Sequence, residues 1–146
     1  LSVKGDSVVR TSYYKYLQPK ECFIEDSKVH PELLRTIKNI PKKKKIVIND
    51  DLLDDNEENK QDEYNLKFVY PFGCSIDFVA NSKKNVSLLF NSGTIAYPAN
   101  RPLAACVSVN KGKLLVIGSE KFVDDEYFEK EENKKIMVII FLLYFM

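Results

Sequence analysis

The sequence predicts an α/β fold, and the stretch from Lys111 to Tyr127 carries the clearest signal for it. Leu114 to Ile117 is a continuous apolar run, which is typical of a strand buried on both faces. Gly118 and Ser119 end this run in a tight turn, and apolar residues then recur at near-helical spacing between acidic ones. A strand, a turn and an amphipathic segment form the repeating unit of α/β domains. Ligands of open α/β sheets usually bind at such a turn.

The first third of the chain is expected to hold short strands and one helix. Ser2 to Arg10 has the composition of a loop with a short strand, and the tyrosine-rich segment Ser12 to Leu17 follows it. We expect this segment to be extended, because Pro19 prevents a helix from continuing and tyrosine favours strands. Pro31 opens a segment whose apolar residues through Ile37 share one helical face. This pattern predicts a short helix with proline in its first turn.

The segment from Lys38 to Tyr64 differs in composition from the rest of the chain. It contains the lysine run Lys42 to Lys45, followed by a block of acidic and asparagine residues from Asp50 to Glu63. Charge blocks of this density cannot pack against a core, so we expect a disordered insertion in a single α/β domain of residues 1–146. Because Leu1 is not an initiator methionine and the chain closes on an apolar run, we expect this domain to be partial.

The second half of the chain is rich in strand signals. One antiparallel hairpin is predicted for Val86 to Tyr97, around the turn residues Asn91 to Gly93. A second is predicted for Leu103 to Ile117, around Asn110 to Lys113. A final helix is expected from about Lys134.

Composition excludes several classes of partner. The 22 basic and 21 acidic residues leave a net charge of +1, which gives no overall field for nucleic acid or an anionic membrane. The apolar run Ile136 to Met146 has about half of the ~20 residues that span a bilayer, so no membrane insertion is expected. Cys22, Cys74 and Cys106 are widely spaced, which predicts neither a disulfide framework nor a zinc site and favours a reducing compartment.

Groups suited to catalysis are scarce, so no enzyme activity, cofactor, metal or small-molecule substrate is expected. The single histidine, His30, precedes a proline in a polar stretch and is expected to be an exposed loop residue. Ser119 follows a strand but lacks the second glycine of a nucleophile elbow. We therefore predict that Ser119 is a structural N-cap, accepting a hydrogen bond from the first turn of the following helix.

Three residues are candidate contacts for a partner or ligand. Tyr70 and Phe72 belong to an aromatic segment that ends in a Pro-Phe-Gly turn, and Arg101 precedes an expected core strand. The planar guanidinium of arginine can bind a carboxylate through paired hydrogen bonds. The alternative is that Arg101 ties its loop to backbone carbonyls.

Several ordered blocks together resemble the intraflagellar transport protein 52 family. The blocks are Val8-Val9-Arg10, Tyr13-x-Lys15-Tyr16-x-x-Pro19-Lys20-Glu21, Phe68 to Gly73, Asn100-Arg101-Pro102, Gly112-Lys113-Leu114 with Val116-x-Gly118-Ser119, and Asp125-x-Tyr127 with Lys130 to Met137. They cover most of the chain outside the charged segment. The sequence departs from the family pattern after Met137, where the family keeps polar residues and Val138 to Met146 has none. Such a helix must be buried on every side or lie in a membrane, unless it results from a misplaced exon end.

The resemblance implies a fold and a function. The family's N-terminal domain resembles the Rossmann-like domain of bacterial gliding and ABC-transport accessory proteins, and this chain would be its C-terminal half. The implied function is a non-catalytic scaffold of the intraflagellar transport B particle, required for cilium or flagellum assembly, with other B-particle subunits as partners. The implied location is the cilium or flagellum and basal body, with a cytoplasmic pool. The alternatives are a carbohydrate-binding or transport-accessory module and a degenerate amidotransferase-like enzyme.

Overall fold

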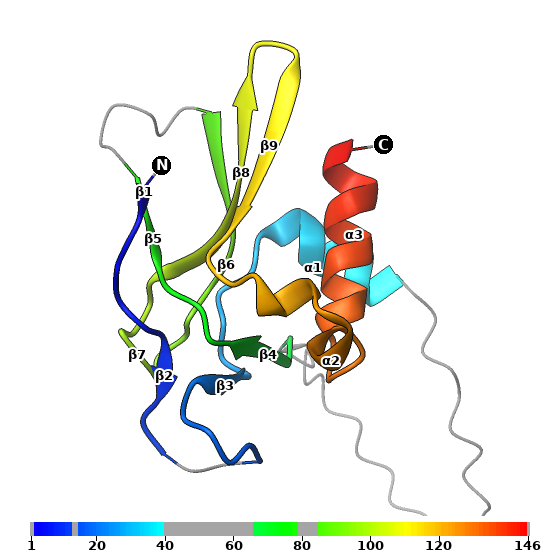
Figure 1. The fold of residues 1–146 in the computed structure, drawn as a ribbon. Helices are drawn as coiled ribbons and strands as arrows, with labels where there is room; N and C mark the ends of the chain where they lie inside the picture. Colours follow the sequence, from blue (N-terminus) through cyan, green and yellow to red (C-terminus); the bar gives the residue numbers. More distant parts are fainter. Residues whose placement is uncertain (1, 13–14, 40–65, 79–84, 146) are drawn as a thin grey trace, which may run out of the picture.

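The structure is a computed structural model that describes residues 2–12, 15–39, 66–78 and 85–145 (Figure 1). It is a mixed α/β fold in which every strand pair of these residues is antiparallel. The elements, in chain order, are β1 (Ser2–Val3), β2 (Val9–Arg10), β3 (Glu21–Ile24), α1 (Pro31–Asn39), β4 (Phe68–Pro71), β5 (Ile76–Asp77), β6 (Val86–Asn91), β7 (Ala96–Tyr97), β8 (Pro102–Val109), β9 (Gly112–Ile117), the 3-10 helix η2 (Lys121–Val123), α2 (Asp125–Phe128) and α3 (Asn133–Phe145).

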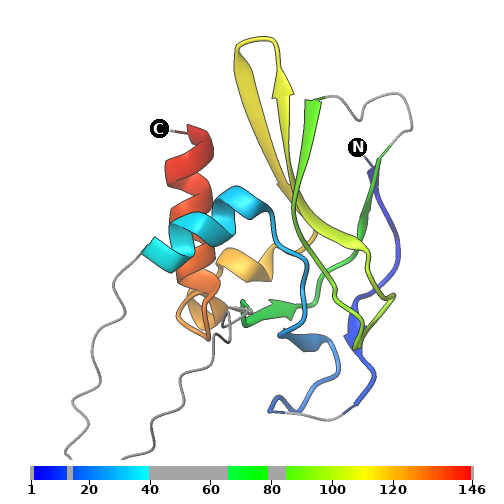
Figure 2. The ribbon, with the colours of Figure 1, turned by 180° about the vertical axis from the view of Figure 1, so that it is seen from behind.

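The largest sheet has the strand order β6-β8-β9, and the other strands form the pairs β1-β5, β2-β7 and β3-β4. Helices α1 and α3 contact each other and lie on the same side of this sheet (Figures 1 and 2). Their buried side chains share one core with β8, which contributes Ala104 and Cys106. The rings of Phe68, Phe90 and Phe122 fill its centre, with centroids 5.0 Å apart for the first two and 5.7 Å apart for the last two.

The two predicted hairpins have different outcomes. The second is confirmed, since β8 and β9 pair with Val109 opposite Gly112, and Asn110 takes the positive φ of 53° that this turn requires. The first is wrong, because β6 pairs with β8 and β7 pairs with β2. The chain does turn after β6, as predicted. However, Ser92 donates its backbone N–H to the carbonyl of Arg101 at 2.9 Å, so the turn region joins the segment before β8 and not β7.

The prediction that Leu114 to Ile117 is buried on both faces is also wrong. These residues lie in β9, which is at the edge of its sheet, and Leu114 is 55% exposed. An unbroken apolar run shows that both faces of a strand are apolar, but whether they are covered depends on the neighbouring elements.

Both predicted helices are confirmed. Pro31 is the first residue of α1, and His30 precedes it with Nδ1 accepting the N–H of Glu32 at 3.4 Å. His30 is therefore a half-buried capping residue rather than an exposed loop residue. Lys38 belongs to α1, and the charged segment beyond residue 39 lies outside the described residues.

Helix α3 is buried on one side only. Ile136, Ile139 and Ile140 are buried, whereas Val138 and Phe141 are 46% and 59% exposed. The expectation that such a helix is buried on every side is wrong for these residues. In the part of the chain that the structure describes, no helix has the length and apolar character needed to cross a membrane.

The start of α3 is joined to β4 through Asn133, whose side chain is completely buried. Its Oδ1 accepts the N–H of Val69 at 3.0 Å, and its Nδ2 donates to the carbonyls of Val69 and Tyr127, each at 3.0 Å. Glu132 continues this pairing, because its N–H donates to the carbonyl of Lys67 and its Oε2 accepts the N–H of Lys67. The Asn133 amide thus takes the place of a neighbouring strand along the second edge of β4.

Replacing Asn133 by alanine should strongly destabilise the fold. Asn133→Ala leaves the N–H and C=O of Val69 buried without these partners, and we expect the free energy of unfolding to fall by about 3 kcal/mol. Urea unfolding followed by circular dichroism measures the change. Asn85→Ala, at an exposed asparagine, is the control and should change the free energy of unfolding by less than about 0.5 kcal/mol. Equal effects of the two substitutions would contradict the role of Asn133.

Candidate functional site

The turn after β9, where an α/β fold usually binds a ligand, is filled by protein. Gly118 donates its N–H to the carbonyl of Leu103 at 3.0 Å and accepts the N–H of Cys74 at 2.9 Å. A Cβ atom on Gly118 would lie 2.2 Å from the carbonyl oxygen of Cys74 and 2.5 Å from the hydroxyl of Tyr70. The turn therefore serves as a close crossing of two backbone segments and leaves no room for a ligand.

The prediction that Ser119 is a helix cap is wrong. Ser119 is buried, and its hydroxyl donates a hydrogen bond to the carbonyl of Pro71. The next helical segment, η2, begins after Glu120, and Asp124 caps α2 by accepting the N–H of Glu126 at 3.2 Å. Ser119 lies too early in the chain to cap either helix, so it fixes the crossing of β9 with the end of β4.

The three predicted contact residues lie in different environments. Tyr70 is completely buried and donates its hydroxyl to the carbonyl of Cys74 at 2.8 Å, and burial raises the pKa of this hydroxyl. It is a core residue that no partner can reach in this fold, which corrects the prediction of a contact.

Arg101 is exposed, and its backbone N–H and C=O both bond to Ser92. Backbone groups rather than the guanidinium hold this loop, and a contact through the Arg101 side chain stays a prediction.

Phe72 is 44% exposed and lies beside residues that the sequence did not single out. Its backbone has a positive φ of 48°, and its N–H donates to the carbonyl of Lys20 at 2.8 Å. This conformation directs the Phe72 ring to the edge of the Tyr127 ring, with centroids 6.3 Å apart. A bulky residue is held in the left-handed region only where its surroundings fix it. Here the carbonyl of Lys20, just before β3, and the ring of Tyr127 in α2 fix Phe72.

Four rings form what we call the aromatic cluster: Tyr16, Phe23, Phe72 and Tyr127. Phe23 and Tyr127 are buried, so Phe72 and the half-buried Tyr16 are the rings that reach the surface. The rings of Tyr16 and Phe23 lie 6.3 Å apart. Cations cover the rings, since Lys130 Nζ is 4.0 Å from the centroid of Tyr127 and Lys15 Nζ is 5.0 Å from that of Phe23. Such cation–π contacts order the long lysine side chains at the surface.

Carboxylates hold the two tyrosine hydroxyls of the cluster. Tyr127 donates to Glu21 Oε1 at 2.7 Å, and Tyr16 donates to Glu131 Oε1 at 3.0 Å. Burial is the first cause that raises the pKa of each phenol, and the hydrogen bond to the carboxylate is the second. Lys15 also forms an ion pair with Glu131. Acidic and basic groups thus alternate around the aromatic cluster.

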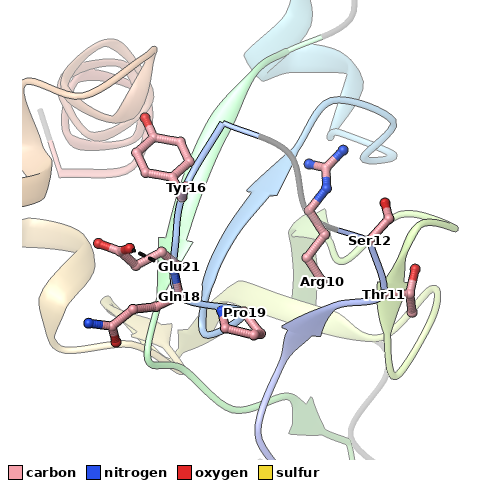
Figure 3. A pocket seen from close by; sticks show the side chains of 7 residues that line it. All are labelled: Arg10, Thr11, Ser12, Tyr16, Gln18, Pro19 and Glu21. Atoms are coloured by element: carbon pink, nitrogen blue, oxygen red, sulfur yellow. Dashed lines mark hydrogen bonds between the residues drawn. The ribbon is translucent and has the colours of Figure 1, made fainter.

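A cavity of about 190 Å³ lies beside the cluster (Figure 3). Figure 3 shows Tyr16, Gln18 and Glu21 on one side of it, and Arg10, Thr11 and Ser12 on the other. Arg10 donates from Nη1 to the carbonyl of Phe23 and lies over the Phe23 ring, 5.4 Å from its centroid. The cavity is lined by Arg10, Thr11, Ser12, Tyr16, Gln18, Pro19 and Glu21. It presents a ring, hydroxyls, an amide and both charges, which suits polar and aromatic groups of a protein surface.

The site offers contact chemistry rather than a nucleophile with its base. The Ser119 hydroxyl is committed to Pro71, and Nδ1 of His30 accepts a backbone N–H of α1. Among the described residues, no group of three or more His, Cys, Asp or Glu side chains could hold a metal ion. Burial raises the pKa of the Cys22 thiol to about 12, so this cysteine stays protonated and unreactive at neutral pH.

Substitution of Gly118 tests the close backbone crossing between Gly118 and Cys74. Gly118→Ala introduces a Cβ atom that overlaps the Cys74 carbonyl, and we expect the free energy of unfolding to fall by about 3 kcal/mol. Gly112→Ala is the control, because a Cβ there meets only the carbonyl of Val109 at 3.5 Å and should change the stability by less than about 0.5 kcal/mol. Thermal and urea unfolding of both variants measure the difference. A stable Gly118→Ala variant would show that the crossing is looser than described.

The raised pKa of Tyr127 predicts a loss of stability at alkaline pH. A phenol whose pKa is raised on folding stabilises the protein fully below the ordinary tyrosine pKa of about 10, and this contribution is lost as pH rises through the folded-state pKa. Tyr127→Phe should therefore reduce the difference in free energy of unfolding between about pH 8 and about pH 11. Tyr97→Phe, at a tyrosine that is 67% exposed, is the control substitution. An unchanged difference in Tyr127→Phe would contradict the role of this hydroxyl.

This chain is similar to known proteins in both sequence and fold. The family model "IFT52 GIFT domain" matches residues 1–145. The intraflagellar transport protein 52 homolog of mouse (Mus musculus) is 38% identical over 145 residues, which are 97% of this chain and 31% of the mouse protein. The human (Homo sapiens) homolog is 35% identical over 144 residues, which are 97% of this chain and 30% of the human protein.

A solved structure described as the mmIFT52 N-terminal domain superposes with a TM-score of 0.70 at 33% sequence identity. The superposition covers 95% of this chain and 50% of that one. The chain thus spans about a third of the curated relatives and half of the solved domain. Because the family model extends over nearly the whole sequence and the fold agrees, this chain belongs to the IFT52 GIFT domain family.

Proposed function

We propose that the protein is a non-catalytic scaffold subunit of the intraflagellar transport B particle, required for cilium or flagellum assembly. The observation that carries this proposal is the family match over residues 1–145, whose relatives are named intraflagellar transport protein 52 homologs. The proposed location is the cilium or flagellum and the basal body, with a cytoplasmic pool. The proposed partners are other subunits of the B particle.

The aromatic cluster is the surface on which we place such a contact. Aromatic side chains are enriched at protein–protein interfaces, and a few anchoring residues usually supply most of the affinity. Phe72 is 44% exposed and packs against Tyr127, whose ring lies under Lys130 Nζ, while Lys15 Nζ lies over the ring of Phe23. Acidic and basic groups nearly balance, which supports recognition of the partner through shape and aromatic contacts rather than through net charge.

The chain is also proposed to be the latter half of a Rossmann-like domain, with the charged segment as an insertion in it. Support comes from the 50% coverage of the solved domain and from the combination of strands with helices α1 and α3. The carbohydrate-binding alternative is motivated by the turn at Gly118 and Ser119 and by fold analogy alone. This turn is filled by Tyr70 and the segment that ends at Cys74, which favours the scaffold function.

A chimera tests the proposed function. In mouse cells depleted of intraflagellar transport protein 52 homolog, this chain replaces the matching part of the mouse protein. We expect the chimera to restore cilia and to co-precipitate other transport subunits. A chimera with Phe72→Ala should co-precipitate at least one subunit about tenfold less well, because truncation of an exposed aromatic anchor costs more than 1 kcal/mol.

Tyr97→Ala in the same chimera is the control, since Tyr97 is an aromatic residue that is 67% exposed and lies outside the aromatic cluster. Equal loss in both variants would argue against a specific role of the cluster. Failure of the unsubstituted chimera to enter cilia, at normal abundance, would refute the proposed function.

A further inference from the structure

The sheet β6-β8-β9 carries apolar side chains on both of its faces. One face contributes Ala104 and Cys106 to the core, and their register partners Ile117 and Leu115 pack against the same core. Successive residues of a strand point to opposite faces of a sheet. The intervening residues and their register partners therefore form what we call the second face: Val86, Leu88, Ala105, Val107, Val109, Leu114 and Val116.

The second face is covered at one end and open at the other. Ala105 is completely buried, and β5 packs against β8. Val109 and Leu114, near the turn of the hairpin, are 57% and 55% exposed. Figures 1 and 2 both show the β8–β9 hairpin projecting beyond the helices and β5. The exposed apolar side chains thus lie on the part of the sheet that extends past the rest of the molecule.

This pattern is typical of a sheet that has a layer on each side. An antiparallel sheet with one face in water alternates apolar with polar residues, whereas a sheet between two layers is apolar on both faces. In β8 the second-face positions are Ala105, Val107 and Val109, and in β9 they are Leu114 and Val116. None of these positions carries a polar side chain.

We propose that the second face is the surface against which the other half of a GIFT domain packs, through an amphipathic helix with an aliphatic stripe. The solved mmIFT52 N-terminal domain covers 95% of this chain at a TM-score of 0.70, yet the match occupies only 50% of that domain. That domain therefore contains about as much chain again outside the region that matches. Helices are the elements that cover the faces of sheets in α/β domains.

Reconstitution from two polypeptides tests this docking surface. The probe is the half of the mmIFT52 N-terminal domain that lies outside the match, produced separately. This chain and the probe are mixed in urea and refolded together by dilution, so that neither has to fold alone. We expect a one-to-one complex in light scattering, and titration calorimetry should show that Leu114→Lys weakens it about tenfold or more, because a lysine would be buried against apolar groups.

Leu17→Lys is the matched control, because it also replaces an exposed leucine by lysine, and it should bind the probe as the unsubstituted chain does. Three results would overturn the proposal. They are the absence of a complex with the unsubstituted chain, equal affinities of the two lysine variants, and a homodimer of this chain that Leu114→Lys abolishes.

Discussion

The pairing of the Asn133 side chain with β4 is the interaction on which the arrangement of this fold depends. A carboxamide carries one acceptor and two donor hydrogens on adjacent atoms, so it can bond to the N–H and C=O of Val69 as a neighbouring strand would. Its second donor hydrogen holds the carbonyl of Tyr127. One buried side chain therefore fixes a strand, a short helix and the start of α3 relative to one another. Of the aromatic cluster, Tyr127 belongs to this short helix and Phe72 directly follows this strand.

The aromatic cluster depends on this junction. Tyr127 ends up beside Phe72 because α2 is held against the end of β4, and Glu131 reaches Tyr16 from the turn that precedes Asn133. The cations and carboxylates around the rings nearly cancel, as they do in the whole chain with its net charge of +1. A site of this kind selects a partner by the fit of its rings and by short-range hydrogen bonds, since its long-range field is weak.

Local signals in the sequence were sufficient to predict helices α1 and α3 and the β8–β9 hairpin. Pro31 fixes the start of a helix, and the Asn110 turn joins two strands that are adjacent in the chain. The pairing of β6 with β8, the cover of β9 and the role of Ser119 could not be predicted, because each depends on a segment distant in sequence. The same holds for the aromatic cluster, whose hydrogen bonds join residues 106 and 115 positions apart. Ring and charge composition alone does not reveal such contacts.

The carboxamide at the border of β4 also determines where this fold can be extended. A strand edge with free backbone groups recruits other strands, including those of foreign chains. Strand β4 pairs with β3 along one edge, and Asn133 and Glu132 occupy its other edge. No further strand can therefore pair with β4. In the described part of the chain β9 pairs with β8 alone, which leaves its outer side available. Among the described residues, β4 is thus closed at both of its edges, whereas β9 keeps one edge without a strand partner.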